Sequence, residues 1–242
     1  MFQLSNKIRG KFPKKLKKLS IKRKKISDDF MKHWHGVLRD KYTIVDKFNH
    51  EYIVNNRPKN FNNVLEIGAG DGEHLYYEKL NKKKLKNYFA LDIRKNMLSR
   101  LNKKFAEVNS IEGDCQKKTG FKSNFFDRVI AIHVLEHLPN LPKALFEINR
   151  IIKKNGIFQV IIPCEGSLAY SLARKISAER VFKKRYNMSY DWFIEREHLN
   201  IPSEIFNEFK RFFKIDSIKY FPISGIPLEF CNLCIGVNLK KK

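Results

Sequence analysis

The sequence is short of acidic residues, cysteine, glycine and long apolar runs. Its 242 residues include 25 acidic side chains against 49 lysines and arginines, a formal net charge of +24. Such a field favours anionic partners, although an A/T-rich genome produces part of the lysine excess. No apolar run reaches the roughly 18 residues that span a bilayer, and the N-terminus lacks the apolar core of a signal peptide. We therefore expect a cytoplasmic protein.

Cysteine is scarce, with only Cys115, Cys164, Cys231 and Cys234, and we expect free thiols in a reducing compartment. Cys231 and Cys234 form a C-x-x-C, but no second such pair and no histidine pair at ligand spacing accompanies them. Their apolar surroundings predict a strand instead. We therefore assign no metal ligand. Hydrophobic residues make up 43% of the chain, which is enough for a packed core.

Residues 7–25 form a basic block in which Ile8, Phe12, Leu16 and Leu19 share one helical face. Pro13 favours a helix that begins there. A basic amphipathic helix is typical of an anionic membrane surface or of an RNA-contacting arm, and a solvated tail is the simpler alternative. In the membrane interpretation the protein is peripheral on the inner face of the membrane. We separate this segment (1–26) from a helical extension (27–60) and an α/β domain (61–242).

From residue 64 onward, short apolar runs alternate with segments of helical periodicity. Strands are predicted at 64–67, 88–93, 108–114, 127–135 and 156–163, with helices between them at 73–83, 95–105 and 142–152. This alternation is typical of a doubly wound, mostly parallel sheet. Residues 164–200 are aromatic and basic, and we expect a helical cap there. Residues 212–223 and 229–239 are expected to close the sheet as an antiparallel hairpin.

Glycine is also rare, yet Gly68, Gly70 and Gly72 fall together directly after the first predicted strand. Ligands of open parallel sheets bind at the carboxyl ends of the strands, where glycine lets a ligand touch the main chain. A dinucleotide site would have a glycine at position 73, where this chain has Glu73. Asp71 and Glu73 oppose a pyrophosphate and suit a cation. The local charges therefore favour S-adenosylmethionine, which carries a sulfonium and an amino group, over NAD.

Two carboxylates follow the next predicted strands. Asp92 ends the second strand, where a carboxylate can accept hydrogen bonds from both hydroxyls of a ribose. Asp114 ends the third strand, where it can face an adenine amino group. Both positions agree with a nucleoside-bearing cofactor.

Five segments, in this order, resemble class I S-adenosylmethionine-dependent methyltransferases of the methyltransferase type 11 group: VLEIGAGDGEH (64–74), LDIRKNML (91–98), EGDCQ (112–116), FDRVIAIHVLEHLPN (126–140) and IIKKNGIFQVIIP (151–163). The resemblance implies a Rossmann-like, seven-stranded sheet and S-adenosylmethionine as cofactor. It implies that the methionine moiety is lined by Glu66, Gly68 and Gly70. It also implies a set of nucleoside and sulfonium contacts: Asp92 at the ribose, Ile93 against the adenine, Asp114 and Cys115 at the adenine, and His133 beside the sulfonium and substrate.

His133, Glu136 and His137 share one face of the turn that follows the fourth predicted strand. His133 is a candidate general base, and His198 is a second histidine that could face the substrate. The turn is similar to the metal-binding E-x-x-E-H of ubiquinone-biosynthesis O-methyltransferases. Here His133 replaces the first Glu, whereas magnesium prefers oxygen ligands. Structural packing of the turn is the alternative interpretation.

The sequence favours O-methylation of a small-molecule, glycan or lipid-linked acceptor in cell-envelope metabolism. The net charge supports an RNA methyltransferase as the alternative, but no separate RNA-binding module is recognisable. The turn after the fourth strand also lacks the Asn/Asp-Pro-Pro-Tyr of enzymes that methylate nucleobase amino groups. A quinone O-methyltransferase of the ubiquinone type is a second alternative.

Overall fold

The computed structural model describes residues 11–34, 43–224 and 229–242. Its sheet has seven strands in the order β3-β2-β1-β4-β5-β7-β6. The strands are β1 (Val64–Ile67), β2 (Tyr88–Asp92), β3 (Asn109–Glu112), β4 (Phe126–Ile132), β5 (Ile152–Pro163), β6 (Phe213–Phe221) and β7 (Cys234–Lys241). All neighbours from β3 to β5 pair in parallel, whereas β7 is antiparallel to β5 and to β6. The predicted doubly wound sheet with a closing hairpin is confirmed.

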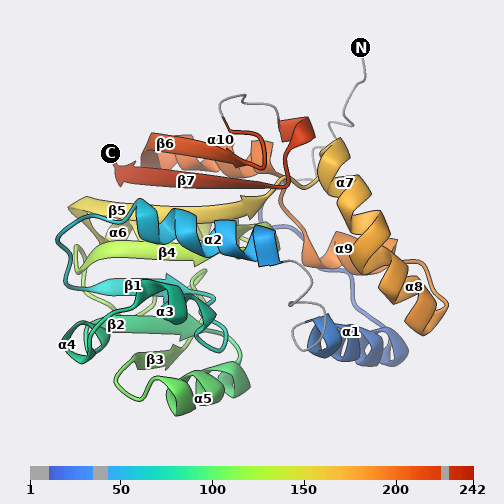
Figure 1. Ribbon diagram of the computed structural model, residues 1–242, viewed down its shortest axis with the longest axis horizontal. Coiled ribbons are helices and arrows are strands. Elements are labelled where there is room, and N and C mark those ends of the chain that lie inside the picture. Colours follow the sequence, from blue (N-terminus) through green and yellow to red (C-terminus); the bar gives the residue numbers. More distant parts are fainter. Residues whose placement is uncertain (1–10, 35–42, 225–228) are drawn as a thin grey trace.

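Helices cover both faces of the sheet (Figure 1). One face packs against α2 (Thr43–Asn55), α3 (Glu73–Glu78) and α5 (Lys95–Lys104), with the short α4 (Lys82–Leu85) nearby. The other face packs against α6 (Leu141–Ile151) and α10 (Pro202–Phe212). Strands β1, β4 and β5 are therefore covered on both faces, which agrees with their largely apolar sequences.

The cap predicted at 164–200 is helical and lies beyond the carboxyl ends of the parallel strands (Figure 1). It consists of α7 (Leu168–Arg174), a π-helical stretch η4 (Lys175–Glu179), α8 (Arg180–Tyr186) and α9 (Asp191–Glu197). Its aromatic residues form a separate core around Phe30 of α1 (Ile21–His33). Phe30 makes edge-to-face contacts with Phe182 and Phe193 at centroid distances of 5.0 and 5.2 Å. The N-terminal extension thus serves two packing surfaces, α1 on the cap and α2 on the sheet.

The expected helix from Pro13 is wrong for residues 14–20, whereas residues 21–25 at the end of the basic block are helical. Residues 14–20 have no helical hydrogen bonding, and α1 begins only at Ile21 with the Ser20 side chain as its N-cap. The reason is a tertiary contact: the Lys14 ammonium is buried and donates to the Leu199 carbonyl at 2.8 Å and to Glu204 at 2.7 Å. Ile8 lies outside the described residues.

The four cysteines are free, and Cys231 belongs to a short 3₁₀ turn, η5 (Glu229–Cys231), rather than to a strand. Cys234 opens β7. Among the helices in the described ranges, none combines the length and the apolar character that crossing a bilayer requires.

Candidate active site

The glycine loop leaves β1 at the carboxyl edge of the sheet, and Gly68, Gly70 and Gly72 all have positive φ. Gly68 is needed because a Cβ there would lie 2.5 Å from Cγ2 of Val134, in the turn after β4. Gly70, with a φ of +56°, instead faces open space, since the nearest atom to a Cβ would be Nη2 of Arg94 at 4.0 Å. The loop is therefore packed at Gly68 and offers bare main chain at Gly70.

Asp92 connects this loop to the end of β2. Its Oδ2 accepts the Gly70 N–H at 2.9 Å, and its Oδ1 accepts the Arg94 N–H at 2.8 Å. The Arg94 guanidinium also pairs with the carboxylate at 3.1 Å. Asp92 is only 3% exposed, so its position is tightly fixed. Arg94 was not predicted from the sequence, although a cation two residues after an isolated aspartate is a visible signal.

Ile93, Asp114 and Cys115 lie beside Asp92 on the neighbouring strand ends. Ile93 is 68% exposed, so its apolar side chain is available to a ligand at this edge of the sheet. Asp114 Oδ1 accepts the backbone N–H of Gln116 at 2.9 Å. Burial raises the pKa of the Cys115 thiol to about 12, so this thiol is un-ionised at neutral pH. The predicted nucleoside-binding residues thus share one edge of the sheet.

Glu66, also predicted to line the site, points to the face that α2 and α3 cover. Its carboxyl group accepts the Tyr88 hydroxyl at 2.8 Å and is 4% exposed. Burial raises the pKa of Glu66 to about 8, which makes it an uncharged acid at neutral pH. Glu66 therefore holds a proton close to the glycine loop.

The turn after β4 carries three ionisable side chains. His133 has a φ of +51°, in the left-handed region, and its Nδ1 lies 3.2 Å from Oε1 of Glu136. Burial lowers the pKa of His133, but contacts with Cys234 and the Glu136 carboxylate outweigh it and raise the pKa to about 10. Burial opposes ionisation of Glu136, but His133 and His137 hold its pKa down at about 2. His133 is therefore a cation that donates hydrogen bonds at neutral pH.

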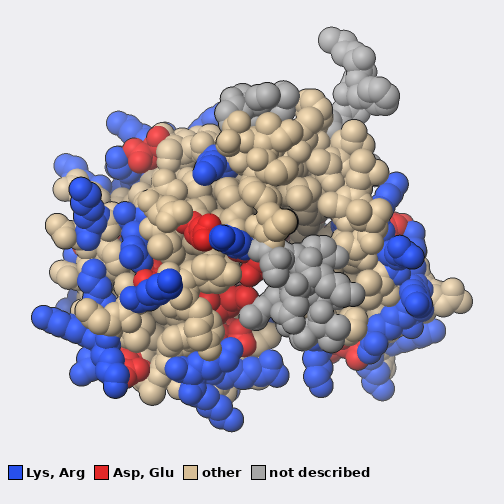
Figure 2. Space-filling view, viewed as in Figure 1, with Lys and Arg blue, Asp and Glu red and all other residues tan. Residues whose placement is uncertain are grey.

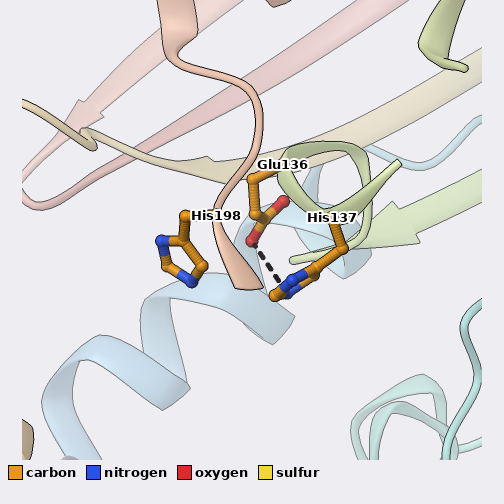
Figure 3. Close-up of side chains that lie close together, drawn as sticks. All are labelled: Glu136, His137 and His198. Atoms are coloured by element: carbon orange, nitrogen blue, oxygen red, sulfur yellow. Dashed lines mark ion pairs between the residues drawn. The ribbon is translucent and has the colours of Figure 1, made fainter. Parts of the chain in front are cut away.

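Glu136 lies between the rings of His137 and His198 (Figure 3). The three residues offer ligand-type atoms that lie within 4.8 Å of one another. Glu136 is 1% exposed, and its Oε2 has no hydrogen-bond partner among the described residues. His137 donates from Nδ1 to the Glu197 carbonyl at 2.5 Å, and burial lowers its pKa to about 4. His137 is therefore neutral, with its Nε2 lone pair on the side of Glu136.

His198 comes from the end of the cap but is tied to the same turn. The N–H groups of Leu199 and Asn200 donate to the Glu136 carbonyl at 2.7 and 3.0 Å. His198 Nδ1 lies 2.7 Å from Oε2 of Glu165, a carboxylate that also pairs with Arg174 at 2.6 Å. Because a carboxylate only accepts, His198 donates through Nδ1 and carries its lone pair on Nε2 when neutral.

Sequence reasoning identified His198 but missed its partner Glu165. The signal was present, because Glu165 follows β5 directly and so lies at the same edge of the sheet as the glycine loop. The structure thus brings His133, Glu136, His137 and His198 together, and it adds a carboxylate that orients one of the histidines.

Comparison with known proteins places this geometry in a family. A family model described as a methyltransferase domain matches residues 65–160, which contain the glycine loop, Asp92, Asp114 and the turn after β4. Residues 65–160 therefore form a methyltransferase domain of the S-adenosylmethionine-dependent class. A possible histamine N-methyltransferase of Thermotoga maritima has a similar fold, with a TM-score of 0.63 and 16% identity over 90% of this chain and 99% of that one.

Two curated relatives match the methyltransferase in sequence. MJ0638 of Methanocaldococcus jannaschii is 33% identical over 171 residues, 70% of this chain and 56% of the relative. The human mitochondrial arginine-hydroxylase NDUFAF5 is 34% identical over 101 residues, 42% of this chain and 28% of the relative. The chain therefore spans about half the length of the first relative and less of the second.

The methyltransferase family implies S-adenosylmethionine as cofactor, and the residues present fit it. The open space over Gly70 is a cradle that a Cβ would begin to fill. A fixed carboxylate, Asp92, and an exposed apolar side chain, Ile93, follow on the neighbouring strand. These are the groups that a ribose and an adenine ring require. Asp92 would exchange its Arg94 contacts for ribose hydroxyls while keeping the Gly70 N–H.

Proposed function

We propose that this methyltransferase methylates a hydroxyl oxygen of a small-molecule, glycan or lipid-linked acceptor, with His198 as general base. The Glu165–His198 contact of 2.7 Å carries this proposal, because it is the arrangement that fixes a histidine as a proton acceptor. S-adenosylmethionine supplies an electrophilic methyl carbon. When bound, it would give its methyl group to the acceptor oxygen and leave as S-adenosylhomocysteine, and Nε2 of His198 would accept the hydroxyl proton.

His133 and His137 have different roles. His133, whose pKa is raised to about 10, is unsuited to accept a proton at neutral pH and would donate a hydrogen bond to the acceptor or hold Glu136. Glu136 and neutral His137 lie beside His198, and the rings of His137 and His198 are in contact at a centroid distance of 5.1 Å. This assignment gives the role of base to His198 and leaves His133 as a positioning cation, in place of the base that the sequence suggested.

Calorimetric titration with S-adenosylmethionine and S-adenosylhomocysteine is the first test. Asp92→Asn should weaken cofactor binding by ~1–3 kcal/mol, because it removes charge-assisted hydrogen bonds to the ribose. Asp191→Asn, an exposed carboxylate change in the cap, is the matched control. Equal affinity of the wild type and Asp92→Asn would contradict the cofactor assignment.

Transfer of labelled methyl groups to a panel of sugar and lipid-linked hydroxyl compounds tests the base. We expect His198→Ala to reduce kcat by roughly 10²–10⁴-fold with little change in cofactor affinity, and Glu165→Gln to reduce it less. Glu179→Gln, which removes a cap carboxylate paired with Lys183, should leave kcat unchanged. A rate that stays the same in His198→Ala would exclude His198 as base.

The basic N-terminal segment supports a lipid-linked acceptor. Leu16 and Ile21 are 45% and 79% exposed, and Lys17, Lys18 and Lys22 are exposed between and beside them. Apolar side chains among lysines suit an anionic membrane surface. Replacing the three lysines with glutamate should abolish co-sedimentation with phosphatidylserine vesicles. Unchanged vesicle binding, or salt-sensitive binding to RNA alone, would favour the RNA alternative.

A further inference from the structure

A second cluster of metal-ligating side chains lies between α2 and α3, separate from Glu136, His137 and His198. Asp46 and His50 are one turn apart on α2, and Glu73 is the first residue of α3. Their ligand atoms lie within 4.8 Å of one another. His50 is only 6% exposed, whereas Asp46 and Glu73 are half-buried and line a groove of about 680 Å³ between the two helices.

Aromatic contacts hold the His50 ring in one orientation. It stacks on Tyr77 at a centroid distance of 4.5 Å and on His74 at 5.3 Å. Tyr77 also donates its hydroxyl to Oδ2 of Asp46 at 3.3 Å, so the same side chain positions two members of the cluster. The Nδ1 atoms of His50 and His74 are 3.1 Å apart, which leaves Nε2 of His50 directed towards Asp46.

Hydrogen bonding fixes which ring nitrogens carry protons. Glu78 is paired with Arg128 at 2.6 Å and acts as a carboxylate, so Nε2 of His74, 3.0 Å from it, must donate. A neutral, fully buried His74 then has its lone pair on Nδ1 and accepts the Nδ1–H of His50. Nε2 of His50, on the other side of the ring, lies 3.5 Å from Oδ1 of Asp46.

The ligand atoms of Asp46, His50 and Glu73 lie close enough together for one divalent cation to contact all three. One imidazole nitrogen and two carboxylates form a donor set for zinc and similar divalent ions. The hydrogen bond from Nδ1 of His50 to His74 is the kind of support that orients a ligating histidine. We propose that Asp46, His50 and Glu73 bind a divalent transition-metal ion of the zinc class.

The surroundings favour a cation over an anion, despite the net charge of +24. Figure 2 shows acidic side chains gathered near the middle of the face that α2 and α3 cover, with lysine and arginine along its margins. Glu51 adds a further carboxylate to the groove, while Arg57 and Lys79 lie at the end near Glu78. The cluster is therefore an acidic site on a basic protein.

Calorimetric titration of the full chain with zinc chloride tests the site directly. We expect one equivalent to bind, and Asp46→Asn, His50→Gln and Glu73→Gln each to weaken binding by ~10-fold or more. Glu51→Gln is the matched control, since it lies on the same helix and groove but outside the cluster, and its affinity should match the wild type. No zinc binding, or equal binding by all four variants, would overturn the proposal.

Thermal unfolding keeps the test independent of any folding defect in His50→Gln. Zinc should raise the Tm of the wild type and of Glu51→Gln, because a ligand that binds only the native state stabilises it. At the same zinc concentration the rise should be clearly smaller in Glu73→Gln, whose side chain is at the surface of the groove. A full rise in Glu73→Gln would place zinc elsewhere in the chain.

The outcome is separable from the proposed methyl transfer. Titrating the same variants with S-adenosylmethionine shows whether Glu73, which follows the glycine loop, instead receives the amino group of the cofactor. Zinc binding that is lost in the variants while cofactor affinity persists supports a metal site. Cofactor affinity that is lost while zinc never binds would overturn the metal site and leave the methyltransferase assignment intact.

Discussion

The two faces of the sheet are stabilised in different ways. The face under α6 and α10 is a continuous apolar layer in which Leu145, Phe158 and Phe209 are fully buried. The face under α2 and α3 has an apolar layer as well, but a chain of buried polar groups crosses it. Arg128 is completely buried there and contacts Glu78 at 2.6 Å and Gln159 at 2.5 Å.

This difference shows where the fold relies on buried apolar surface and where it relies on the pairing of buried charges. Burying apolar surface is favourable without any partner, at about 25 cal/mol per Å². A buried charge is costly unless a counter-charge and hydrogen bonds compensate it, so the network constrains geometry more than it adds stability. The constrained face is the one that adjoins the glycine loop through Glu66 and His74. We interpret the polar chain as a device that positions α2 and α3 beside the cofactor site.

The largest expected effect comes from breaking the network at Glu78. Glu78→Gln leaves Arg128 buried without its counter-charge, so the free energy of unfolding should fall by ~3–5 kcal/mol in urea titration. The Glu78 pKa is lowered to about 2, with burial opposing its ionisation and His74 and Arg128 outweighing it. The stabilisation is present above the unfolded pKa near 4.5 and is lost as pH falls through about 2. The deficit of the variant should therefore shrink in acid, whereas surface Glu51→Gln should show no deficit.

The apolar face provides the reference for that loss. Leu145→Ala removes a fully buried side chain from α6 and should lower the free energy of unfolding by ~2–5 kcal/mol through lost burial and the remaining cavity. No titratable group is involved, so the loss relative to wild type should be the same at pH 4 and pH 8 in chemical denaturation. A pH-dependent loss would mean that the two faces are not energetically separate.

Helix α2 packs against β7 at Gly236, where the absence of a side chain makes room for the Tyr52 ring. A Cβ on Gly236 would lie 2.6 Å from the Tyr52 ring, so Gly236→Ala forces α2 outward. We expect a loss of ~1–3 kcal/mol from overpacking, measured by thermal unfolding. A Gly236→Ala/Tyr52→Leu double variant should recover part of it, and failure of that recovery would locate the strain elsewhere.

The sequence predicted the apolar framework and the glycine loop because both depend on local pattern. Strand period and glycine position sufficed for β1, β2 and the ends that carry Asp92 and Asp114. The Glu78–Arg128 pair could not be predicted from the sequence. A chain with 31% charged residues offers many possible ion pairs, and only the tertiary structure determines that this one is buried.

The prediction of a helix in the N-terminal segment failed for a similar reason. Helical periodicity around Leu16 and Leu19 favoured a helix, but the buried contact of Lys14 with Glu204, 190 residues away, holds residues 14–20 in an irregular path. Glu165 was missed because its role depends on the cap bringing His198 back to the sheet edge. Residues whose function depends on long-range contacts were therefore the ones that pattern alone could not assign.

The effect that is smallest at pH 5, and grows as pH rises, concerns Glu66, whose pKa is shifted in the opposite direction from that of Glu78. Burial raises the Glu66 pKa to about 8, so the folded state holds a proton that the unfolded state has released above about 4.5. This contribution is fully present below the unfolded pKa and is lost progressively as pH rises from there through about 8, by at most ~1.4 kcal/mol per pH unit. Glu66→Gln imitates the protonated acid and keeps an acceptor for Tyr88. The variant should gain stability over wild type as pH rises from 5 to 8 in urea titration, and parallel curves for the two proteins would show that Glu66 is ionised in the fold.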